Sequence, residues 1–126
     1  MLNILLASST LILVPLGTSI VADQVTTYRC LKLNGYEGYQ VKEGNKFPGM
    51  QVLSGRIIYS TIEFAGIYAA TRSHSPRLQR VGKIAGITLI LMHTSCAIHN
   101  EKTRSQILNR EPAKRGFFGK ICLIGN

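Results

Sequence analysis

Basic side chains gather in two stretches of the sequence, residues 72–83 and 102–120. Such clusters attract the phosphate backbone of RNA, and the tyrosines offer faces on which bases stack. The same charge also suits anionic membranes or acidic polymers, or keeps a small domain soluble. The cations that we expect to bind RNA are Arg72, Arg77, Lys83, Lys102, Arg104, Arg110, Lys114 and Arg115.

The remaining residues with reactive side chains are few and isolated. The three histidines and three cysteines have none of the spacings typical of zinc ligands, so we expect no metal and no cofactor. Taken alone, Glu63 is typical of an exposed strand residue that pairs with a cation on the neighbouring strand. His93 follows an apolar run, as a hydrogen-bonded residue at the end of a strand does, and Arg80 belongs to the first basic stretch.

The size and charge of the chain limit what it can be. It has 126 residues and a net charge of +9, which suits one domain. Asp23 is the first charged residue, so all of this charge lies on the 104 residues from Asp23 to Asn126. This distribution argues against a multidomain enzyme, an acidic tail and a polytopic membrane protein.

The N-terminal segment resembles a secretory signal peptide. Residues 1–22 are apolar and uncharged, contain Pro15 and Gly17, and end with a plausible cleavage point after Ala22. The alternative is a single membrane anchor, although Ser and Thr dilute the segment. The other apolar run, Ile84–Met92, is nine residues long, too short to cross a bilayer. We therefore expect a secreted single domain at residues 23–126 with no stable membrane insertion.

Secretion gives the cysteines a structural meaning, because disulfides persist in oxidising compartments. Cys30, Cys96 and Cys122 allow one bridge with three possible pairings. We favour Cys30–Cys122, which would tie the two ends of the domain together, and leave Cys96 as a buried thiol. In the alternative, Cys96 is paired and another cysteine is free.

The residues of the mature chain favour strands over helices. Residues 31–46 contain several glycines and allow one short helix at most. Residues 50–70 are rich in Ile, Tyr and Val, and residues 84–93 form an apolar run, so both predict strands. Residues 103–110 form a short helix or a loop, and residues 117–124 a last strand. The predicted fold class is α+β, dominated by an antiparallel sheet.

A signal peptide followed by Tyr28-Arg29-Cys30, with a last cysteine near the C-terminus, resembles the secreted, ribonuclease-like candidate effectors of powdery mildew fungi. The resemblance implies a fold similar to the small guanyl-specific fungal ribonucleases, with one short helix packed on an antiparallel sheet. It also implies one disulfide between Cys30 and Cys122.

The ribonuclease motifs are followed in order but incompletely. Phe47-Pro48-Gly49 resembles the family's Tyr-Pro-His, and Ile62-Glu63-Phe64 resembles its strand with the glutamate. Gln79-Arg80-Val81 resembles the family's Asp-Arg-Val, and His93-Thr94-Ser95 resembles its His-Thr-Gly. In an active enzyme the resemblance makes Glu63 the base, His93 the acid and Arg80 the phosphate clamp. Because Phe47 and Gly49 replace the family's Tyr and second His, activity is expected to be weak or absent.

The function that we expect from the sequence is therefore a secreted virulence effector and candidate avirulence protein. On the resemblance, it acts inside host plant cells and suppresses immunity by binding RNA or host proteins, and an intracellular immune receptor is a possible partner. The alternatives are an active ribonuclease that cleaves single-stranded RNA, or a small cationic protein that acts on membranes.

Overall fold

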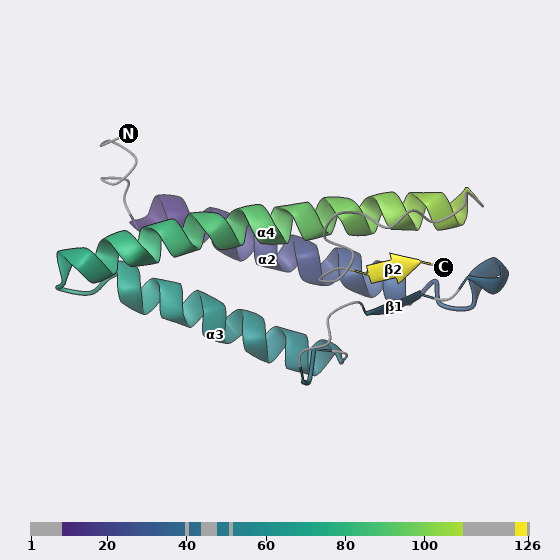
Figure 1. Ribbon diagram of the computed structural model, residues 1–126, viewed down its shortest axis with the longest axis horizontal. Coiled ribbons are helices and arrows are strands. Elements are labelled where there is room, and N and C mark those ends of the chain that lie inside the picture. The colour runs from purple at the N-terminus through teal and green to yellow at the C-terminus, as the bar shows by residue number, and fades with distance from the viewer. Residues whose placement is uncertain (1–8, 40, 44–47, 51, 110–122, 126) are drawn as a thin grey trace.

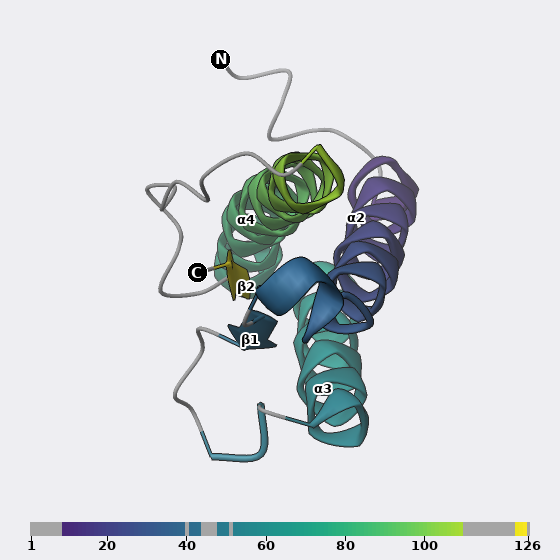
Figure 2. The same cartoon turned by 90° about the vertical axis from the view of Figure 1, so that its right-hand side faces the viewer.

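The computed structural model is a bundle of three long helices (Figure 1). It describes residues 9–39, 41–43, 48–50, 52–109 and 123–125. Helices α2 and α4 run in the same direction, and α3 runs antiparallel to both. Viewed from one end, the three helices form a triangle (Figure 2). In chain order the elements are α2 (Ser9–Leu31), the 3-10 turn η1 (Tyr36–Gly38), β1 (Val41–Glu43), α3 (Leu53–Thr71), α4 (Pro76–Leu108) and β2 (Leu123–Gly125).

The predicted α+β fold, with one short helix on an antiparallel sheet, is wrong. The only sheet among the described residues is a two-stranded antiparallel ribbon in which Val41 is paired with Gly125 and Glu43 with Leu123. Leu123 and Ile124 of the expected last strand thus lie in β2, and residues 117–122 lie outside the described part of the chain. Without a larger sheet, the structure has no ribonuclease-like frame.

Residues 53–71 form helix α3 because the side chains they bury recur with the helical period. Arg56, Ser60, Ile67 and Thr71 are buried and lie on one face, while the isoleucines and tyrosines that favoured strands lie mostly outside it. The β-propensity of a residue reflects how its side chain packs on a half-buried surface. The pattern of buried positions along the segment therefore decides between strand and helix, and here it overrides the β-propensity of the isoleucines and tyrosines. The strand prediction for residues 50–70 is therefore wrong.

The apolar run at residues 84–93, which predicted a central strand, lies within helix α4, so this strand prediction is wrong. Helix α4 begins with an N-cap at Ser75, whose hydroxyl accepts a hydrogen bond from the Leu78 backbone N–H at 3.4 Å, and has Pro76 in its first turn. It continues for 33 residues, well past both ends of the apolar run. The nine apolar residues are thus the middle of a helix and not an isolated strand.

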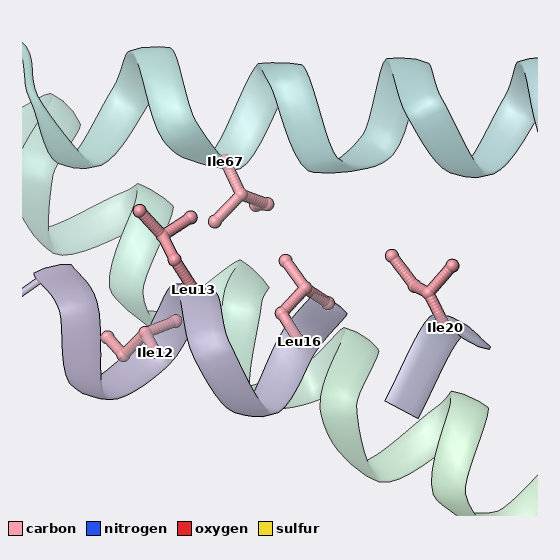
Figure 3. Packing of buried hydrophobic residues seen from close by; sticks show 5 residues of the cluster. All are labelled: Ile12, Leu13, Leu16, Ile20 and Ile67. Carbon is pink, nitrogen blue, oxygen red and sulfur yellow. The ribbon is translucent and has the colours of Figure 1, made fainter. Parts of the chain in front are cut away.

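The largest apolar cluster holds the three helices together near the start of α2. Figure 3 shows four side chains of α2 beside Ile67 of α3. Gly82 and Gly86 let α4 approach closely. A Cβ at Gly82 would lie 2.7 Å from the Ala70 Cβ, and one at Gly86 would lie 2.6 Å from the Ile12 Cγ2. The buried members of the cluster are Ile12, Leu13, Leu16, Ile20 and Ile67.

Helix α2 runs without interruption through Ala22 and Asp23, where cleavage of a signal peptide was predicted. The segment before this point supplies most of the apolar cluster, so in this structure it is part of the folded bundle. The signal peptide itself stays a prediction, since the structure does not test processing.

Candidate functional site

His93 lies between two carboxylates that come from the other two helices. Its Nδ1 lies 2.7 Å from Asp23 Oδ2 on α2, and its Nε2 lies 3.0 Å from Glu63 Oε2 on α3. The ring donates to both carboxylates only as the imidazolium, because neutral imidazole has a single N–H. Asp23 and His93 are nearly enclosed, with side chains 6% and 13% exposed, whereas Glu63 is 37% exposed.

Arg56 completes the charge balance of this site. Its Nη2 lies 3.6 Å from Asp23 Oδ1, and its side chain is 5% exposed. Arg56 Nε donates to Gln24 Oε1 and Nη2 donates to Thr27 Oγ1, both at 3.1 Å. A buried charge is tolerated when it is paired and hydrogen-bonded. We call Asp23, Arg56, Glu63 and His93 the ionic cluster, whose two positive and two negative charges sum to zero.

A polar layer extends the ionic cluster toward the end of the bundle that holds the β-ribbon. Asn100 Nδ2 donates to Thr27 Oγ1 at 3.0 Å and to Thr26 Oγ1 at 3.3 Å. Cys30 Sγ donates to the Asn100 carbonyl oxygen at 2.9 Å. In the other direction along the bundle lies the apolar cluster of Figure 3. The bundle therefore has a polar half and an apolar half.

The structure brings together two of the three predicted catalytic residues. Glu63 and His93 are in direct contact, but Arg80 is exposed near the start of α4, thirteen positions before His93, or about 20 Å along the helix axis. Glu63 and His93 bond to each other rather than flanking an open space, which leaves no room between them for a phosphodiester. Arg56, and not Arg80, supplies the arginine of the cluster.

The predicted RNA-binding cations do not form one surface. Arg72, Arg77 and Lys83 lie around the turn between α3 and α4, whereas Lys102 and Arg104 lie near the other end of α4. Lys83 and Lys102 are about 28 Å apart along the helix. Arg104 also pairs with a glutamate of α4 at 3.7 Å. Arg110, Lys114 and Arg115 lie outside the described residues.

The cysteines differ from the predicted pairing. Cys30 is a free, buried thiol, so its predicted disulfide with Cys122 is wrong. Cys96, predicted to be free, is disulfide-bonded. Cys122 lies outside the described residues. Cys30 packs instead with Val41 and Ile107, where α2 and α4 meet the β-ribbon.

No group of three or more His, Cys, Asp or Glu side chains is placed to hold a metal ion within the described part of the chain. The two acidic side chains and the imidazole of the ionic cluster are paired with one another and with Arg56.

The outer surface of the bundle is unusually apolar. Large apolar side chains are exposed along the whole length of all three helices. Two of the described helices, α2 and α4, are long and apolar enough to cross a membrane, a property that they share with signal sequences and with core helices of soluble proteins. In the most apolar window of α4, however, only 17% of the residues are buried, unlike a core helix. Examples of these exposed side chains are Leu11, Val14, Val21, Ile58, Ile62, Val81, Ile84, Leu91 and Ile98.

Sequence reasoning missed Arg56, Asp23 and Asn100, and it missed the role of two glycines in helix packing. The available signals were helical spacings. Arg56 and Glu63 are seven residues apart, two helical turns on one face. Gly82 and Gly86 form a G-x-x-x-G motif, which is typical of closely packed membrane helices.

Three comparisons with known proteins add nothing to this geometry. No protein-family model matches the chain, and no similar curated protein or solved structure was found.

Proposed function

We propose that this protein works inside a lipid bilayer, as a small membrane subunit whose three helices cross the membrane. The observation that carries the proposal is the distribution of side chains. The charged residues of the ionic cluster point inward and are paired, whereas many large apolar side chains of all three helices point outward. This is the arrangement that a bilayer favours and water does not.

The lengths of the helices support the proposal. The segment of α4 between Lys83 and Lys102 contains no other Lys or Arg and no acidic residue except Glu101, and spans about 28 Å, close to the thickness of a hydrocarbon core. Helix α3 has 19 residues and is of similar length. Lysine and arginine at such boundaries extend toward the membrane surface.

The polar interior supports a role in assembly rather than conduction. The ionic cluster joins all three helices. Asp23, Glu63 and His93 lie toward the middle of α2, α3 and α4, and Arg56 lies near the start of α3. In hydrocarbon each of these partners is expensive to leave unpaired. The apolar cluster fills the other half of the bundle, so the described helices enclose no polar path from end to end. The ionic cluster thus fixes how the helices are arranged and does not line a pore.

This proposal departs from the expectation of a secreted protein with no stable membrane insertion. The expected secretion depended on the resemblance of residues 1–22 to a signal peptide. The expected lack of a further membrane span depended on the nine-residue apolar run, which is part of a much longer helix. The effector role, with RNA, host proteins and an immune receptor as partners, stays a prediction that nothing tests. The ribonuclease-like fold that supported its catalytic part is contradicted by the helical bundle.

The proposal is tested by expressing the full chain and extracting the isolated membranes at alkaline pH. An integral membrane protein stays in the pellet and is released only by detergent, still carrying residues 1–22. Recovery of a detergent-free, monomeric protein from the soluble fraction, or from the medium after cleavage at Ala22, would overturn it.

A further inference from the structure

A groove between α2 and α3 opens on the outer surface of the bundle, on a face separate from the contact between His93 and Glu63. Its volume is about 390 Å³, near the lower end for sites that hold small ligands. The walls are apolar and include Val21 and Ile57, which are 61% and 50% exposed, and Phe64. The mouth of the groove therefore continues the apolar surface of the bundle.

The groove also has a polar edge, which distinguishes it from an ordinary gap between helices. Gln24 and Ser60 line it, and Gln24 Nε2 donates to Ser60 Oγ at 2.8 Å. Ser60 is 6% exposed. Among the described residues the Ser60 hydroxyl accepts this hydrogen bond from Gln24 and donates to no side chain, so its O–H is available to a ligand.

The chemistry of this edge selects an uncharged head group. Gln24 and Ser60 are neutral, and the charges behind Gln24 already balance one another within the ionic cluster. A charged ligand would bring a further buried charge without a counter-ion, which is costly. The hydroxyl of an uncharged ligand can accept a hydrogen bond from Ser60 and donate another, and it brings no unpaired charge into the groove.

We infer that this groove binds an uncharged single-chain lipid alcohol, with the hydroxyl at Gln24 and Ser60 and the chain along Val21 and Phe64. The inference rests on the proposed membrane location, because the groove would then open directly to the bilayer from which such a ligand enters. The chain would lie toward Gly17, which lines the apolar end of the groove seven residues, or about 10 Å, before Gln24.

The experiment uses the full chain in lipid nanodiscs with a long-chain alcohol that carries a photoreactive diazirine in its chain. After irradiation, mass spectrometry maps the adducts. We expect them to concentrate on the peptide segments that contain Val21 and Phe64. The parent alcohol should compete, whereas the alkane and the fatty acid of equal length should not.

Matched variants separate a site from general lipid contact. Gly17→Leu should reduce the adducts about tenfold because its side chain enters the groove, in which a Cβ already comes within 3.5 Å of Phe64. Gly66→Leu is its control, since a Cβ there meets nothing within 4 Å. Ser60→Ala should reduce labelling about fivefold, the equivalent of one hydrogen bond, and Ser54→Ala, at an exposed position of α3, should not.

Adducts spread evenly over the outward faces of all three helices, or unchanged in Gly17→Leu, would overturn the inference while leaving the membrane location intact. Stronger competition by the fatty acid would show that the ligand class is wrong. Failure of the proposed function is seen separately, since the chain would then not enter nanodiscs at all.

Discussion

Replacing His93 with leucine tests whether the ionic cluster holds the bundle together. The variant removes one positive charge and leaves Asp23 and Glu63 with Arg56 alone, so the buried charges no longer balance. Removing one member of a buried ion pair typically destabilises a protein by about 3–5 kcal/mol. Because Glu63 is 37% exposed, solvent screens its interaction with His93 and reduces the contribution of that pair. We therefore expect His93→Leu to lower the free energy of unfolding by about 3 kcal/mol.

A second substitution separates lost charge balance from lost packing. In His93→Leu combined with Glu63→Leu, the remaining Asp23 and Arg56 are again neutral as a pair, 3.6 Å apart. The double variant should therefore regain at least half of the stability lost by His93→Leu, about 1.5 kcal/mol or more, so that the two substitutions are not additive. Ser60→Ala, which removes one neutral hydrogen bond, should cost only about 0.6 kcal/mol.

Both comparisons are made by unfolding the detergent-solubilised protein reversibly with sodium dodecyl sulfate and following helix content by circular dichroism. If the two substitutions add, so that the double variant is less stable than either single variant, the charge-balance argument is refuted. A His93→Leu variant as stable as the native chain would refute the pairing itself.

Three further predictions concern the helix contacts, the free thiol and the outer surface. Gly86→Leu should cost about 1–3 kcal/mol, because a Cβ at this position meets an α2 side chain at 2.6 Å, and Gly66→Leu should be neutral in the same unfolding assay. Cys30 should resist iodoacetamide in the folded protein and react within the same time after unfolding, and equal reaction rates would contradict its burial. Leu91→Arg, at a side chain 63% exposed, should lower membrane retention by about 2.5–3.5 kcal/mol, measured as the fraction pelleted after alkaline extraction; a water-soluble bundle would instead tolerate it.

The fold was mispredicted because apolar residues were assumed to mark the core. In α3, Ile57, Ile58 and Ile62 are exposed, whereas Arg56 and Ser60 are buried. Periodicity tells which residues share a face, but it does not tell whether that face meets protein, water or lipid. The sequence alone therefore could not decide between a strand with an apolar inner side and a helix with an apolar outer side.

The candidate site was partly recognised from residue types. Glu63 and His93 were singled out as groups that can do chemistry, and they do lie in contact. Their partner Asp23 was placed at the start of the mature chain, and Arg56 was not considered, because the contacts among α2, α3 and α4 join residues 30 to 70 positions apart. Separations of this kind follow from the helix arrangement and not from any local pattern.

The short turn between α3 and α4 has a consequence for how the protein is made. Of the described helices, only α2 and α4 are apolar enough to enter a bilayer by composition, since α3 carries Arg56 and Glu63. Four residues connect α3 to the capped start of α4, so the two helices form an antiparallel hairpin. On the proposed membrane location, α3 would be carried into the bilayer by its successor. In a chain that ended before Pro76, α3 would stay outside the bilayer, and Glu63 would lack its partner His93 on α4.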